Sequence, residues 1–127
     1  MKKMLMMTAA ALVLAGGLSL AQAADVDNGK ALFKSPTLGG GTTGKSCNTC
    51  HPGGKKLGGD LFTRKQLTIM GMDKASVADM VNVCIEKPLG GKAIDPQGAE
   101  MQDLLAYMKT LTAKQSKKKA RKVIEGC

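Results

Sequence analysis

Two cysteines and a histidine form the most chemically specific pattern in the chain. Residues 46–51 read SCNTCH, so Cys47 and Cys50 are separated by two residues and followed at once by His51, the single histidine. Thiols at this spacing can reach neighbouring vinyl groups of one porphyrin, while the next side chain offers an imidazole nitrogen to the iron. The C-x-x-C-H pattern is the attachment signature of c-type haem. It predicts one covalently bound haem c, with Cys47 and Cys50 as thioether links and His51 as the proximal iron ligand.

The first 23 residues have the pattern of a secretory signal peptide. Lys2 and Lys3 precede an uncharged apolar stretch, and Ala21-Gln22-Ala23 forms an A-x-A cleavage site before the charges resume at Asp25. Glycines interrupt the apolar stretch, which falls short of the roughly 20 residues that a transmembrane helix needs. We therefore expect cleavage of residues 1–23 and a periplasmic location.

Other uses of the cysteines explain the pattern less well. Four cysteines in an exported chain are typical of two disulfides, but that does not account for the adjacent histidine. A zinc knuckle needs two further ligands at comparable spacing, and there is no second C-x-x-C and no other histidine. A thioredoxin-like pair needs a strand before it and a helix after it, whereas this motif lies between two glycine-rich runs.

The remaining chain is one small domain with little material for a core. Its aromatic residues are Phe33, Phe62 and Tyr107, there is no Trp, and glycine is abundant. Domains of this size usually need a disulfide, metal or cofactor in addition to their apolar side chains. A porphyrin would supply the large flat apolar surface that the sequence lacks. We assign residues 24–113 to this domain and residues 114–127 to a basic C-terminal tail.

The periodicity of the sequence predicts an all-α domain of three to four helices. Residues 25–34, 73–87 and 95–111 have helical patterns, with Asp25 or Asp27, Ser76 and Asp95 as expected N-caps and Pro88 ending the second helix. Residues 35–45 and 52–60 read as loops, and residues 61–72 read ambiguously as a short helix. The expected buried stripes are Val77, Met80, Val81 and Cys84 in the second helix, and Met101, Leu104, Leu105 and Met108 in the third.

The helix carrying NGKALF, the CNTCH motif and the final EMQDLLAYMKTL together resemble class I c-type cytochromes. The resemblance implies the small fold of that family around one haem, in which Gly29 and Phe33 of the first helix cross Tyr107 of the last. It also implies a single-haem electron carrier. The resemblance covers most of the chain after the signal peptide, and it is specific at the haem motif and weaker at the two terminal helices.

The sixth iron ligand departs from the family pattern. Class I cytochromes usually carry a methionine in the loop before the last helix, but here that loop reads IEKPLGGKAIDP. The candidates are Met72, Met70 and Cys84, the last in a segment similar to cytochrome domains of the sulfur-oxidation and thiosulfate-dehydrogenase type and to an oxygen-binding bacterial cytochrome. Alternatively, Cys84 pairs with Cys127 in a disulfide. The resemblance therefore also allows a haem subunit of a sulfur-compound-oxidising enzyme or a gas-binding haem protein.

Charge indicates the kind of partner. The formal net charge is +9, or about +7 without Lys2 and Lys3, and six cations lie within KQSKKKARK at residues 114–122. This tail is either a solvated, partly disordered end or a docking patch for an acidic redox partner or an anionic membrane surface. Nucleic acid is not expected as a partner, since no aromatic residue is present there to stack on bases. No catalytic constellation is visible, so we expect an electron carrier and not an enzyme.

Overall fold

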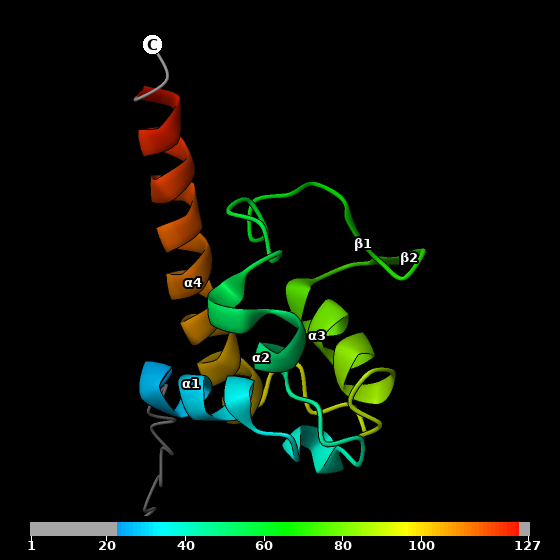
Figure 1. The fold of residues 1–127 in the computed structure, drawn as a ribbon. Helices are drawn as coiled ribbons and strands as arrows, with labels where there is room; N and C mark the ends of the chain where they lie inside the picture. The colour runs from blue at the N-terminus through cyan, green and yellow to red at the C-terminus, as the bar shows by residue number, and fades with distance from the viewer. Residues whose placement is uncertain (1–22, 125–127) are drawn as a thin grey trace, which may run out of the picture.

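The computed structural model describes residues 23–124 as helices joined by loops, with one small hairpin (Figure 1). Nearly all of the predicted signal peptide and Cys127 lie outside the described residues. The elements in chain order are α1 (Val26–Lys34), the 3₁₀ turn η1 (Leu38–Gly40), α2 (Cys47–Cys50), the 3₁₀ turn η2 (Pro52–Gly54), β1 (Leu67–Ile69), β2 (Met72–Lys74), α3 (Val77–Glu86) and α4 (Ala99–Ile124). The domain is thus mostly helical, as the periodicity predicts. No helix among the described residues combines the length and the apolarity needed to cross a membrane.

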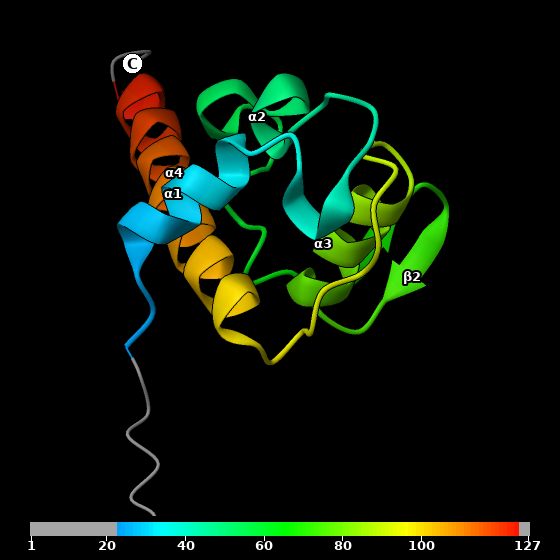
Figure 2. The same ribbon diagram turned by 90° about the horizontal axis from the view of Figure 1, so that it is seen from below.

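Helices α1 and α4 cross and pack closely, as Figure 2 shows. A Cβ on Gly29 would stand 1.9 Å from the carbonyl oxygen of Asp103, so only glycine permits this approach. One turn later, the rings of Phe33 and Tyr107 meet edge to face with their centroids 5.5 Å apart. The crossing that the family resemblance implies for Gly29, Phe33 and Tyr107 is therefore confirmed.

The start of α1 is fixed to α4 by one carboxylate as well as by the helix crossing. Asp25 caps α1, because its Oδ1 accepts from the backbone N–H groups of Asp27 and Asn28 at 2.9 and 3.0 Å. The carboxylate of Asp103 accepts from the backbone N–H of Asp25 and from Nδ2 of Asn28, both at 2.7 Å. The predicted cap at Asp25 is confirmed, and Asp103 joins that cap to the last helix.

The interpretation of residues 61–72 as a short helix is wrong. They lead into an antiparallel hairpin in which Leu67 pairs with Lys74 and Ile69 pairs with Met72. The two residues of the turn, Met70 and Gly71, have φ angles of 51° and 75°. Two-residue hairpin turns of this kind need positive φ at both central positions, and Gly71 adopts such an angle without strain. The turn reverses the chain at Met70 and Gly71, so no helix forms there.

Helix α3 has the predicted start and end. The Ser76 hydroxyl accepts from the backbone N–H of Asp79 at 3.1 Å, and the helix ends at Glu86, two residues before Pro88. Its burial pattern differs from the prediction. The buried residues are Ala78, Val81, Val83 and Ile85, whereas the other members of the expected stripe, Val77, Met80 and Cys84, are partly buried.

The last helix begins later and extends further than expected. Asp95 accepts from the backbone N–H of Gln97 at 2.9 Å in a separate turn, and α4 starts at Ala99. Its buried side includes Met101 and Leu104, both with no exposed surface. The helix then continues through residues 114–124, so a partly disordered tail is not what the structure shows there. No Gly or Pro interrupts residues 99–124, and Lys, Arg, Gln and Ala are good helix formers.

Candidate functional site

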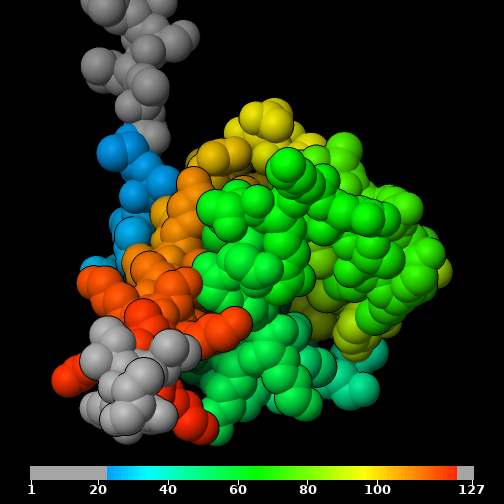
Figure 3. All heavy atoms as spheres, turned by 90° about the horizontal axis from the view of Figure 1, so that it is seen from above, coloured from blue at the N-terminus to red at the C-terminus, as the bar shows by residue number. Residues whose placement is uncertain are grey.

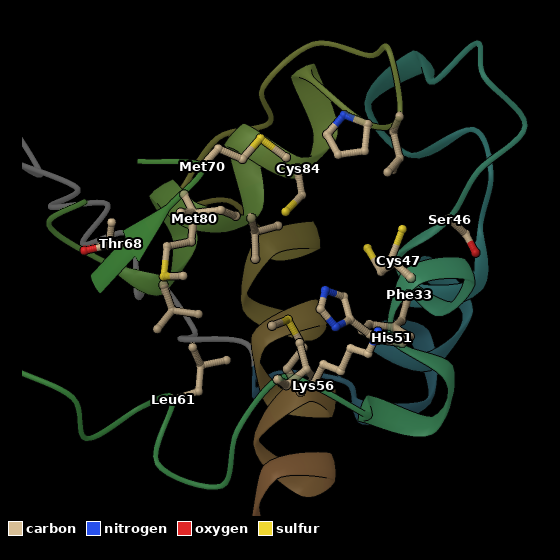
Figure 4. A pocket seen from close by; sticks show the side chains of 18 of the residues that line it. Phe33, Ser46, Cys47, His51, Lys56, Leu61, Thr68, Met70, Met80 and Cys84 are labelled. Carbon is tan, nitrogen blue, oxygen red and sulfur yellow. The ribbon is translucent and has the colours of Figure 1, made fainter. Parts of the chain in front are cut away.

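An apolar pocket of about 400 Å³ lies between the C-x-x-C-H segment and α3 (Figure 4). Its walls come from α1, α2, β1, α3 and α4 and the segments that connect them. The residues that line it include Phe33, Cys47, Cys50, His51, Met70, Met80, Cys84 and Met108. The structure therefore brings the haem motif, the predicted apolar stripe of α3 and one methionine of the hairpin to a single cavity.

The two cysteines of the motif lie on a single helical turn. Ser46 precedes α2, and its backbone N–H donates to the hydroxyl of Thr49 at 3.0 Å, which fixes the start of the turn. The backbone N–H of His51 donates to the carbonyl of Cys47 at 2.9 Å and closes the turn. Residues three apart on a helix share a face. Cys47 and Cys50 are thus presented together with both thiols free.

The imidazole of His51 is held in one tautomer by the backbone. Its Nδ1 lies 2.9 Å from the carbonyl oxygen of Lys55. A carbonyl oxygen can only accept, so Nδ1 carries a proton and donates it, and in the neutral imidazole Nε2 keeps its lone pair. A metal-ligating histidine usually donates its second ring nitrogen to a carbonyl in this way, which fixes both the ring orientation and the tautomer. Figure 4 shows the ring of His51 directed into the pocket.

The turn that carries Lys55 is itself held by short-range bonds. The backbone N–H of Gly54 donates to the carbonyl of His51 at 2.9 Å, and that of Lys55 donates to the carbonyl of Pro52 at 3.2 Å. Gly53 and Gly54 have positive φ angles of 58° and 84°, which the glycines adopt without strain. The glycine-rich run after the motif therefore curls the chain back so that the carbonyl of Lys55 reaches the imidazole.

Burial raises the pKa of two of the thiols that line the pocket, Cys47 and Cys84. Burial raises the pKa of Cys47 to about 11, and the nearby thiol of Cys84 contributes to the same shift. The pKa of Cys84 is also raised, first by burial and then by the proximity of Cys50. Redox-active C-x-x-C pairs depend on a lowered thiol pKa, because the thiolate is the nucleophile. The raised value at Cys47 disfavours a thioredoxin-like role for this pair.

The three candidates for the sixth iron ligand occupy different places. Cys84 lies on α3, and Figure 4 shows its side chain pointing into the pocket from the wall that faces His51. Met70 also lines the pocket, but it sits at the tip of the hairpin and is 58% exposed. Met72 lies on β2 and is not among the lining residues of the described chain. The alternative pairing of Cys84 with Cys127 is untested, because Cys127 lies outside the described residues.

Two residues that shape this site were not among the predicted site residues. Met80 lies one helical turn before Cys84 and lines the pocket, whereas its helical spacing indicated only core packing. Asn82 donates from Nδ2 to the carbonyl of Ile94 at 2.9 Å and accepts from the N–H of the same residue at 3.0 Å. This pair of bonds ties the loop after α3 back to the helix. A polar residue between the buried Val81 and Val83 was the available signal for Asn82.

The loop after α3 is also held by the segment that precedes the haem motif. The hydroxyl of Thr43 donates to the carbonyl of Pro88 at 2.9 Å, and that of Thr42 donates to the carbonyl of Gly90 at 3.1 Å. Pro88 and Leu89 both line the pocket. The threonines between the glycines of residues 39–44 therefore fix one wall of the cavity, although the sequence indicated only an open loop there.

Comparisons with known proteins identify no relative of this chain. No family model, no curated protein and no solved structure matches it. Among the described residues, no three or more His, Cys, Asp or Glu side chains are grouped to hold a metal ion between them. The functional interpretation therefore depends on the C-x-x-C-H turn, the oriented imidazole and the apolar pocket.

Proposed function

We propose that this chain is a periplasmic single-haem c-type cytochrome, with the class I fold, that carries one electron at a time between redox proteins. The observation that supports this proposal most strongly is the hydrogen bond from Nδ1 of His51 to the carbonyl of Lys55. It leaves Nε2 available as a ligand at the wall of an apolar pocket, next to a helical turn that presents two free thiols. Haem attachment uses both thiols and the imidazole of the motif.

The residues present fit a covalently bound haem. Cys47 and Cys50 would form the thioether links, and Nε2 of His51 would bind the iron on the proximal side. Phe33 and Met108 would pack against the porphyrin from the side of the helix crossing. Such a group supplies a ferric/ferrous couple suited to one-electron transfer. The protein's contribution is to orient the imidazole and to surround the group with apolar side chains that limit the access of water.

A second candidate function depends on Cys84. A thiolate as the sixth iron ligand lowers the reduction potential of a haem, whereas a methionine raises it. Cys84 lines the pocket, Met72 does not, and Met70 is largely exposed. This arrangement favours, as the alternative, a haem subunit of an enzyme that oxidises sulfur compounds. The other alternative is a gas-binding haem protein with an open sixth position, and added carbon monoxide would then shift the spectrum of the reduced protein.

The proposal is tested by exporting the chain from a host that has a cytochrome c maturation system and recording visible spectra. The His51→Ala variant removes the proximal ligand but keeps both thiols, so we expect an attached haem with an altered Soret band and a shifted potential. Asn48→Ala is the matched control, since Asn48 lies in the same motif and its Oδ1 accepts only from the backbone N–H of Gly53. An unchanged spectrum in His51→Ala would remove His51 as a ligand.

A further inference from the structure

The C-terminal part of α4 carries five cations on one face. Residues spaced i, i+3, i+4, i+7 and i+8 share a side of a helix, and the cations at this spacing are Lys114, Lys117, Lys118, Arg121 and Lys122. All five are exposed, and together they border one shallow surface hollow. We call this surface the cationic face. Its first and last residues are eight positions apart, which is about 12 Å along a helix.

The helix that bears the cationic face is attached to the segment that follows His51. Nε2 of Gln115 donates to the carbonyl of Gly54, and the hydroxyl of Ser116 donates to the carbonyl of Gly59 at 2.9 Å. Neither Gln115 nor Ser116 belongs to the cationic face. In Figure 3 the end of α4, coloured orange to red, stands at one corner of the molecule beside the green segment that contains these glycines. The cationic face is therefore held in place and not left on a free tail.

The like charges of residues 114–122 destabilise the helix that they form. Lys114 and Lys118, Lys117 and Arg121, and Lys118 and Lys122 are like-charged pairs at i, i+4, a spacing at which repulsion destabilises a helix. Residues 114–122 contain no Asp or Glu to offset it. The helix dipole favours cations only near the last turn. An anionic surface laid along the cationic face would remove the repulsion, so this geometry favours an acidic partner.

Two other anionic partners fit the cationic face less well. A helix that lies in a membrane surface needs an apolar face opposite its charges. Between residues 113 and 122 the only apolar residues are Ala113 and Ala120. Single-stranded nucleic acid binding combines cations with aromatic residues that stack on bases, and this segment has none. We infer that the cationic face binds an acidic protein surface whose carboxylates are spread over about 12 Å.

The position of the cationic face also indicates where the partner lies. Gly54, which Gln115 contacts, is one residue before Lys55, whose carbonyl orients the imidazole of His51. A protein docked on the cationic face therefore binds the helix that Gln115 ties to the segment after His51. This part of the inference rests on the proposed function, because it makes the docked protein the one that exchanges electrons. The binding itself does not require it.

The test measures the binding of poly-L-glutamate to the purified, exported protein by calorimetry across a salt series. Two neighbouring lysines provide a matched pair, since Lys118 belongs to the cationic face and Lys119 does not. We expect Lys118→Gln to weaken binding about 1.4- to 5-fold, the range for one exposed ion pair, and Lys119→Gln to weaken it much less. We also expect binding to weaken as salt rises, because the Debye length shortens.

Three results would overturn the inference. Equal losses of affinity in Lys118→Gln and Lys119→Gln would show that binding depends on the net charge and not on the cationic face. Tighter binding to phosphatidylglycerol vesicles than to poly-L-glutamate would assign the segment to a membrane. An absence of binding at low salt would leave the face without a polyanionic partner. None of these results bears on the haem, whose presence is read from the visible spectrum. A chain that binds poly-L-glutamate but carries no haem would support the inference about the cationic face and contradict the proposed function.

Discussion

Gly29 lies against the backbone of Asp103 so closely that a Cβ at this position would stand 1.9 Å from the Asp103 carbonyl oxygen. Helices α1 and α4 cross at this contact, and the rings of Phe33 and Tyr107 pack one turn further along. Both helices contribute residues to the pocket, through Phe33 and Met108. The crossing therefore determines the position of the pocket wall that lies away from α3.

Gly29→Ala is expected to destabilise the domain, although alanine is the better helix former by about 1 kcal/mol. The added methyl group must push the two helices apart, and overpacking of this kind costs about 1–3 kcal/mol or more. The free energy of unfolding is measured by urea denaturation, with circular dichroism as the signal. Lys30→Ala, at an exposed neighbouring position, is the control and should change stability by less than about 0.5 kcal/mol. A Gly29→Ala protein as stable as the wild type would contradict the close crossing.

The carboxylate of Asp103 should make the stability of the domain sensitive to acid. The pKa of Asp103 is lowered, first by the hydrogen bond from the Asn28 side chain and then by that from the backbone N–H of Asp25. A carboxyl with a lowered folded-state pKa stabilises the fold above its ordinary value of about 3.9, and this contribution is lost as the pH falls through the folded-state pKa. The stability difference between wild type and Asp103→Asn should therefore be largest near pH 7 and shrink below about pH 4.

This acid dependence is measured by urea unfolding at a series of pH values from 7 down to 3. Asp73→Asn is the control, because Asp73 is an exposed carboxylate on β2 whose bonds are made within the hairpin. A difference between wild type and Asp103→Asn that stays constant over the whole series would show that the carboxylate of Asp103 does not act through its charge.

Asn82→Ala should loosen the loop that follows α3. The variant leaves both the N–H and the carbonyl of Ile94 without their partner in a partly buried place, which costs about 1–3 kcal/mol. The measurement is hydrogen exchange of the Ile94 amide, with amides in α4 as the reference. A general loss of stability would speed exchange at both places, whereas loss of the Asn82 bonds would speed it at Ile94 alone. Glu86→Ala, at an exposed position of the same helix, is the matched control. Equal protection of Ile94 in wild type and Asn82→Ala would contradict this role.

The parts of the fold that follow local rules were predictable from the sequence. The caps at Asp25 and Ser76 and the stop before Pro88 depend on residues within a few positions of each helix end. The C-x-x-C-H turn is equally local. The bond from Nδ1 of His51 to Lys55 spans only four residues, but it depends on a chain path through glycines that leaves no periodic pattern.

The features that the sequence did not predict depend on distant contacts or on unusual backbone angles. The hairpin has three-residue strands and turns at Met70, a non-glycine residue with positive φ. Asn82 contacts a backbone twelve residues away. The stripe of Val77, Met80 and Cys84 has the periodicity of a core face, but it lines a pocket, and periodicity does not distinguish these two environments.

Among the sixth-ligand candidates, Cys84→Ser should change the visible and near-infrared spectra of the haem-loaded protein, and Met72→Leu should not. Cys84 lines the pocket and Met72 is outside its lining. A thiolate or thioether bound to iron gives a sulfur-to-iron charge-transfer band at the red end of the spectrum. Cys127→Ser is the control for a disulfide, since it would affect stability and leave the spectrum unchanged. A spectrum that changes in Met72→Leu and not in Cys84→Ser would contradict the placement of these residues.

The central claim is that Cys47 and Cys50 bind one haem covalently, and mass spectrometry of a single peptide tests it most directly. Trypsin cleaves after Lys45 and Lys55 and releases residues 46–55, which contain both thiols and His51. Addition of each thiol to a vinyl group removes no atoms, so the account predicts the mass of the peptide with two free thiols plus that of one intact haem. A peptide without haem, isolated after export from a host with an active maturation system, would contradict the account. In that case its mass would also show whether the cysteines had lost two hydrogens to a disulfide or remained free thiols.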